Sequence, residues 1–69
     1  MQIHIATFKD EIERAYRTLG FEKGFDQNIR DIRSWRNEGL IDHGEAKELR
    51  LYNKKRYQDL FIDWCAGKA

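Results

Sequence analysis

The sequence predicts an all-α fold, namely a small three-helix domain that contains an antiparallel helical hairpin. Three observations support this prediction. Apolar residues recur at steps of three and four, proline is absent, and one seven-residue stretch holds both a helix stop signal and a helix start signal. A chain of 69 residues has room for one domain, so we expect a single helical domain over residues 1–69.

The first predicted helix spans residues 7–19. Thr7 is a good N-cap, and the acidic residues that follow it suit the positive end of the helix dipole. The apolar stripe of this helix comprises Phe8, Ile12, Ala15 and Leu19. Gly20 follows the stripe and can adopt the left-handed conformation that ends a helix.

The second predicted helix begins after a connector at residues 21–25, with Asp26 as its N-cap. Its apolar stripe comprises Phe25, Ile29 and Ile32, with Trp35 slightly to one side. Gly39 suits the C-cap of this helix, and Asp42 with Glu45 forms a capping box for the next one. So short a turn predicts two antiparallel helices.

The third segment, residues 45–64, has two interpretations. We favour one continuous helix with a broad apolar face, because no glycine or proline interrupts it. In the alternative, Leu49 and Leu51 alternate as a short strand and Asn53 caps a separate final helix, which gives a small winged-helix α+β fold. The position of Asn53 within a helix or at its start distinguishes the two.

Composition limits the class of protein. The 13 basic and 12 acidic residues nearly balance, and Cys65 is the lone cysteine, which suits a reducing compartment. No apolar run is long enough to cross a membrane, and the first residues do not resemble a signal peptide, so we expect a cytoplasmic protein. Because a domain of this size has a thin core, we expect it to gain stability as a homodimer.

Residues that could carry catalysis are scattered. The sequence has no phosphate loop, no nucleotide-binding glycine pattern and no nucleophile elbow. His4, His43 and Cys65 lie at no recognised metal-ligand spacing, and Asp59 with Asp63 is typical of a solvated helix face. We therefore expect a protein that is not an enzyme, without a metal, a cofactor or a small-molecule substrate.

A second apolar surface suggests the function. In a continuous third helix, Leu51 and Ile62 stack on one line, well away from the main apolar face. We predict that a second copy or a protein partner covers them, with Trp35 and Tyr52 completing the interface. The expected function is that of a small regulatory or adaptor protein that acts through protein–protein contacts and self-associates.

The alternative function is DNA binding, with the second helix as the recognition element. Basic and aromatic residues interleave in the middle of the chain, as they do on nucleic-acid-binding surfaces. The candidate nucleic-acid-binding residues are Arg30, Arg33, Arg36, Lys54 and Lys55.

Two short similarities to known families accompany these functions. The stretch Ile32-Arg-Ser-Trp-Arg-Asn-Glu-Gly-Leu-Ile-Asp, followed by Glu45, resembles the helical hairpins called SHOCT domains, which implies an oligomerisation or docking role. Residues 28–41 are similar to the recognition helix of excisionase-type or MerR-type winged-helix proteins, and residues 49–61 to their wing strand and following helix. The chain departs from the second pattern in its long connector and in the acidic Asp42 and Glu45 at the wing tip. Neither similarity assigns the chain to a family.

Overall fold

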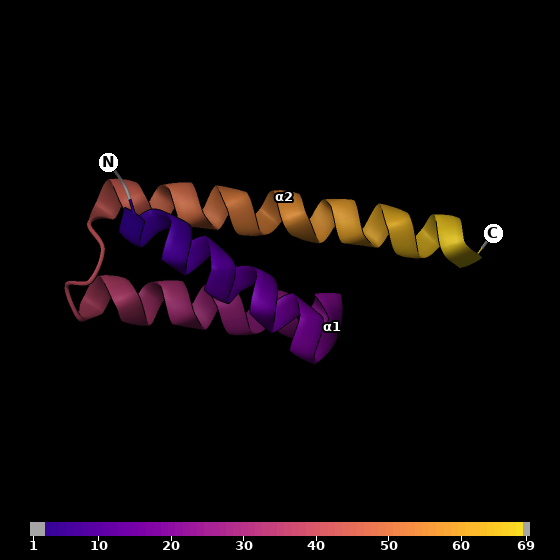
Figure 1. The fold of residues 1–69 in the computed structure, drawn as a ribbon, viewed down its shortest axis with the longest axis horizontal. Coiled ribbons are helices and arrows are strands. Elements are labelled where there is room, and N and C mark those ends of the chain that lie inside the picture. The colour runs from indigo at the N-terminus through magenta and orange to yellow at the C-terminus, as the bar shows by residue number, and fades with distance from the viewer. Residues whose placement is uncertain (1–2, 69) are drawn as a thin grey trace.

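A computed structural model describes residues 3–68, with side chains placed for residues 5–67. Within this range the protein is all-helical and has no strand: α1 spans Ile3–Asn37 and α2 spans His43–Lys68 (Figure 1). The all-α prediction is confirmed. The predicted number of three helices is wrong, because the first two predicted helices belong to one element, α1.

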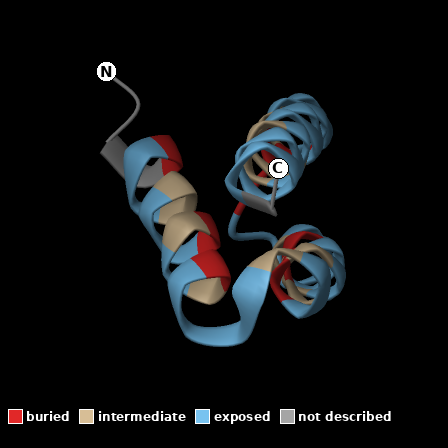
Figure 2. Ribbon diagram, turned by 90° about the vertical axis from the view of Figure 1, so that its right-hand side faces the viewer, coloured by how far each residue is buried: buried red, intermediate tan, exposed pale blue. Residues whose placement is uncertain are grey.

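A sharp break at Gly20 gives α1 its shape. Gly20 has φ 86° and ψ 172°, a positive-φ conformation that side chains with a Cβ rarely adopt. The chain reverses direction there, so that the arms at residues 3–19 and 21–37 lie on two sides of the core (Figures 1 and 2). The special conformation predicted at Gly20 is therefore present, although it bends α1 instead of ending it.

The predicted helix starts at Thr7 and Asp26 are both wrong. The first arm begins at Ile3, where the burial of Ile5 against the core favours helix ahead of Thr7. Residues 21–25 are helical and form no connector. Phe21 and Phe25 both pack against the core from this turn, so tertiary contacts outweigh the capping preference of Asp26.

The turn between α1 and α2 has the predicted capping geometry. Gly39 has φ 79°, and the Leu40 amide donates to the Trp35 carbonyl at 2.9 Å, as in a Schellman cap. At the start of α2, the Glu45 amide donates to Asp42 Oδ1 at 2.7 Å and the Asp42 amide donates to Glu45 Oε1 at 2.9 Å. The antiparallel hairpin of α2 and the second arm of α1 is confirmed.

α2 is continuous through Leu49, Leu51 and Asn53. Asn53 is 1% exposed in the middle of the helix and caps no helix. The winged-helix alternative is therefore not supported, since it requires a strand at Leu49–Leu51.

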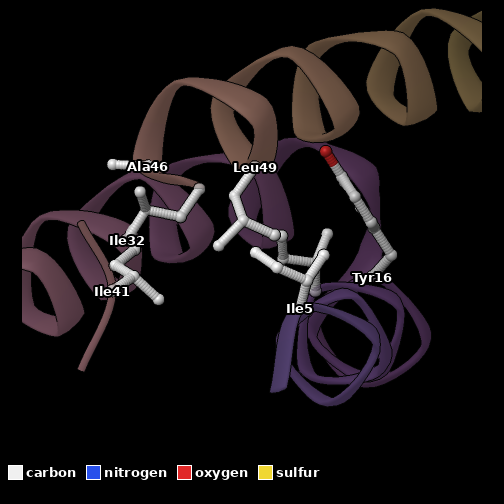
Figure 3. Close-up of a cluster of buried hydrophobic side chains, with 7 residues drawn as sticks. Ile5, Tyr16, Ile32, Ile41, Ala46 and Leu49 are labelled. Carbon is white, nitrogen blue, oxygen red and sulfur yellow. The ribbon is translucent and has the colours of Figure 1, made fainter. Parts of the chain in front are cut away.

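The hydrophobic core lies where the two arms of α1 meet α2. Buried residues of all three segments face the centre (Figure 2), and the side chains labelled in Figure 3 gather there. The buried hydrophobic residues are Ile5, Ile12, Tyr16, Ile32, Ile41, Ala46 and Leu49. Gly24 lets the two arms approach closely, because a Cβ at this position would stand 3.0 Å from Tyr16 Cα and 3.1 Å from the Ala15 carbonyl oxygen.

A buried polar cluster joins the same three segments. The Tyr16 hydroxyl, which points toward α2 in Figure 3, donates to Asn53, whose carbonyl oxygen and Oδ1 lie 2.9 and 2.5 Å away. Asn28 Nδ2 donates to Asn53 Oδ1 at 3.0 Å and to the Ile12 carbonyl at 3.2 Å. These bonds fix the register of the arms against α2, because a shift by one turn would leave the buried amides unpaired.

Candidate protein-binding surface

The C-terminal turns of α2 extend past the bend of α1 (Figure 1). At 1.5 Å per residue, α2 is about 39 Å long and the second arm of α1 about 26 Å, so the last turns of α2 extend beyond the end of that arm. Residues 61–67 are all exposed as a result. They include two aromatic residues, Phe61 and Trp64, at 43% and 49% exposure.

Aromatic rings gather where this extension meets the bend; we call Phe21, Tyr57, Phe61 and Trp64 the aromatic end. The Phe21 ring centroid lies 5.7 Å from Tyr57, 6.0 Å from Phe61 and 5.8 Å from Trp64. The Phe25 ring centroid lies 4.7 Å from that of Tyr57, with the ring planes tilted by 45°, and Phe25 connects the aromatic end to the core. These ring distances are typical of stabilising aromatic pairs, so the end is ordered although its outer rings are exposed.

Two hollows flank the contact between Phe21 and Trp64. One, of about 410 Å³, is lined by Glu13, Tyr16, Arg17, Phe21, Arg56, Leu60, Asp63 and Trp64. The other, of about 340 Å³, lies against the bend and is lined by Leu19, Gly20, Phe21, Glu22, Lys23 and Trp64. The aromatic end therefore has projecting rings with recesses beside them, a surface shape that suits a protein–protein contact.

A charged cluster borders the larger hollow and ties the first arm to α2. Glu13 accepts two bonds from Arg56, at 2.6 and 3.1 Å, and one from the Tyr52 hydroxyl at 2.9 Å. Burial by itself raises the pKa of Glu13, but the hydrogen bonds from Arg56 and Tyr52 outweigh it, and the pKa lies below its ordinary value. Burial, and then the bond to Glu13, raises the pKa of Tyr52. Glu13 is thus held as a carboxylate and Tyr52 as a neutral phenol.

The four residues of the predicted protein interface fall into two pairs. Leu51 and Ile62 are 59% and 63% exposed on the outer side of α2. Trp35 and Tyr52 are only partly exposed and pack within the fold, Trp35 on Phe8 at 4.5 Å and Tyr52 on Glu13. Trp35 and Tyr52 are thus engaged in contacts with this chain's own first arm.

Leu51 and Ile62 do not form a continuous apolar strip. Lys55 and Gln58 stand between them on the same side of α2, at steps of three and four residues, and both are exposed. Ile62 lies next to Phe61 and so adjoins the aromatic end, whereas Leu51 lies about three turns from Ile62 along α2.

The five predicted nucleic-acid-binding residues do not all share one surface. Arg33 and Arg36 line a hollow between the second arm of α1 and α2, together with Arg50. Arg30 bonds Gln27 at 3.4 Å outside that hollow. Lys54 and Lys55 are successive residues of α2, so their side chains leave the helix about 100° apart.

Other candidate chemistry is dispersed. Among the described residues, no group of three or more His, Cys, Asp or Glu side chains could hold a metal ion, and the side chain of His4 lies outside the described range. Cys65 is an exposed free thiol. Asp59, which is partly exposed, has its Oδ2 3.8 Å from Arg56 Nη1. Between Ile3 and Lys68, neither helix is long and apolar enough to cross a membrane.

Three important positions were missed at the sequence level. Phe21 falls in the expected connector, Asn28 belongs to no expected apolar stripe, and Arg50 is not among the five candidate nucleic-acid-binding residues. A signal existed for the first two: Phe21, Phe25, Asn28, Ile32 and Trp35 follow steps of four and three, the spacing of one buried helix face. Asn28 is fully buried on that face, whereas Ile29 of the predicted stripe is 37% exposed.

Comparison with known proteins gives no further guide, since neither a protein family, nor a curated protein, nor a solved structure matches this chain.

Proposed function

We propose that the chain is a self-associating protein-interaction module, with the aromatic end as its interface. The observation that carries this proposal is the extension of α2 beyond α1, which leaves Phe61, Ile62 and Trp64 exposed beside Phe21. Aromatic residues dominate the binding energy of protein interfaces when they are clustered and can be desolvated. A cytoplasmic regulator or adaptor is the broader role that this module would serve.

The occupant we propose is a second copy of the chain. A 69-residue domain buries only about 60% of the surface of its unfolded chain, so covering apolar side chains in a dimer stabilises it more than it would a larger protein. In a twofold dimer each copy presents the same patch, so projecting rings must meet recesses on that patch. The aromatic end has both, because Trp64 projects beside two hollows.

Charges at the rim also suit a second copy. Arg17 and Asp63 both line the larger hollow, and neither has an oppositely charged group within 4 Å among residues 5–67. A twofold axis through this patch can place Arg17 of one copy against Asp63 of the other, twice per dimer. A rim of this kind adds specificity and orientation to an apolar contact.

Sedimentation of Trp64→Ala tests the proposal. Trp64 is half exposed, so its loss should leave the helical circular dichroism unchanged while the dimer dissociation constant rises about thirtyfold, the effect of an interface hot spot of about 2 kcal/mol. Leu40→Ala is the matched control, because Leu40 is 53% exposed at the opposite end of the molecule. A monomeric wild-type chain, or equal weakening by both substitutions, would contradict the proposal.

A further inference from the structure

Three arginine side chains converge on one hollow on the side of the molecule away from the first arm of α1. The hollow has a volume of about 330 Å³ and is lined by Arg33 and Arg36 from α1, Arg50 from α2, and the side chains of Ile29 and Ile32. The pairing of α1 with α2 brings Arg50 to the same hollow as the other two.

The three guanidinium groups have no acidic partner in the described part of the chain. Among residues 5–67, no carboxylate oxygen lies within 4 Å of Arg33, Arg36 or Arg50. The acidic residues nearest to them in sequence are engaged elsewhere: Asp31 with Gln27, Glu38 with Ser34, and Glu48 with Lys9. Three like charges at one hollow repel each other, and a bound anion would reverse that repulsion.

The opposite flank of α2 shows that this arrangement is local. There, Arg56 of α2 is paired with Glu13 of the first arm, and Lys9 of the first arm lies 3.2 Å from Glu48 of α2, so two ion pairs join these segments. The chain has nearly as many acidic as basic residues. The three arginines at the hollow therefore do not reflect an overall excess of positive charge.

We infer that this hollow binds the phosphate group of a small phosphomonoester. Guanidinium groups bind phosphate oxygens through paired, charge-assisted hydrogen bonds, and a terminal phosphate carries close to two negative charges at neutral pH. The isoleucine side chains give the hollow an apolar wall for the organic part of the ligand. Its volume lies at the lower end of the range of small-molecule sites, about 300–1,000 Å³.

A small ligand fits these observations better than a nucleic-acid backbone does. A backbone needs cations spaced along a track, because each phosphodiester carries one charge. Of the basic residues predicted for nucleic acid, Arg30, Lys54 and Lys55 do not line the hollow, so the predicted residues do not form one track along the surface.

Nuclear magnetic resonance of the arginine side chains tests the site. Inorganic phosphate and adenosine monophosphate, titrated separately into the intact chain at low salt, should saturably shift the Nε–H signals of Arg33, Arg36 and Arg50 and leave the other arginines unchanged. Adenosine monophosphate should bind more tightly than phosphate alone, because its base contacts Ile29. Equal affinities of adenosine monophosphate and inorganic phosphate would show that the hollow binds phosphate but makes no contact with the organic part of a phosphomonoester.

One variant inside the hollow and one outside it make the test specific. Arg50→Gln removes an exposed side chain and should weaken phosphate binding about tenfold, the loss expected for one charge-assisted contact. Arg30→Gln is the matched control with the same charge change on the same arm as Arg33 and should bind as the wild type does. Helical circular dichroism of both variants verifies their fold.

Three results would overturn the inference. One is uniform, non-saturating shifts of all arginine signals, and another is equal weakening by Arg30→Gln and Arg50→Gln. The third is tighter binding of a single-stranded oligonucleotide without terminal phosphate, weakened alike by Arg30→Gln and Lys54→Gln, which would indicate an extended polyanion surface. Because these measurements report ligand binding and not sedimentation, their failure is distinguishable from failure of the proposed dimer.

Discussion

Three residues at the centre of this domain make polar contacts that the apolar periodicity of the sequence does not predict. Tyr16, Asn28 and Asn53 are buried, and their hydrogen bonds connect both arms of α1 to α2. A buried amide or hydroxyl without a partner costs about 1–3 kcal/mol, so each of the three depends on the others being in place. Asn28 Oδ1 is itself buried without a partner in the described part of the chain, and some of that cost is therefore already present in the folded state.

Alkaline unfolding should report on Tyr16. Burial raises its pKa from the ordinary value of 10 to about 12. The folded state thus favours the neutral phenol, and its stabilising effect is complete below pH 10 and is lost as the pH rises toward 12. We expect the urea midpoint of the wild type to fall over this range. In Tyr16→Phe the fall should be smaller, by up to about 1.4 kcal/mol per pH unit in the free energy of unfolding.

The difference between the wild type and Tyr16→Phe isolates the effect of Tyr16, since Tyr52, whose pKa is also raised, is present in both proteins. At neutral pH, Tyr16→Phe should cost about 1 kcal/mol, the net worth of one buried hydrogen bond. Parallel curves for wild type and Tyr16→Phe between pH 9 and 12 would show that the folded state does not favour neutral Tyr16.

At the scale of elements, the sequence predicts the helix caps and turns that depend on adjacent residues. It does not predict the helix boundaries and buried positions that depend on tertiary packing. The Schellman cap at Gly39 and the capping box of Asp42 and Glu45 depend on a few adjacent residues, and both were predicted correctly. The start of α1 at Ile3 and the helical turn at residues 21–25 depend on contacts with distant parts of the chain, as does the burial of Asn28. The candidate site divides in the same way: the exposure of Leu51 and Ile62 follows from the periodicity of one helix, whereas the aromatic end exists only because α1 bends against α2.

Gly24 should be the most sensitive glycine in the helices. Alanine normally favours a helix over glycine by up to about 1 kcal/mol. At Gly24 the new Cβ would press on the backbone of the first arm, 3.0 Å from Tyr16 Cα, so we expect Gly24→Ala to destabilise the domain by about 1–3 kcal/mol. Gly44→Ala is the control, because its nearest contact is Asp42 Oδ1 at an ordinary 3.5 Å. Urea denaturation of both variants measures the difference, and a rise in the midpoint of Gly24→Ala would mean that the arms are not in close contact.

The whole molecule is 43 by 22 by 16 Å, with one end well packed and the other extended by α2 alone. The aromatic end and the arginine hollow lie on different parts of this body and have no lining residue in common. One is apolar with a mixed-charge rim and the other is cationic, so they suit different partners. A dimer formed through the aromatic end leaves the arginine hollow open in both copies.

Lysine substitutions at the two most exposed aliphatic residues of α2 should define the extent of the dimer interface. If the aromatic end is the interface, Ile62→Lys places a charge beside Phe61 in the contact and should give a monomer in sedimentation. Leu51 lies about three turns from Ile62, so Leu51→Lys should stay a dimer. If a longer strip along α2 is the interface, each substitution alone should weaken the dimer. Both side chains are about 60% exposed, so the single variants and the double variant should keep their helical circular dichroism. Unfolding of the double variant would show that Leu51 and Ile62 support the fold of the single chain, whereas a folded dimer would place the contact between copies elsewhere on the molecule.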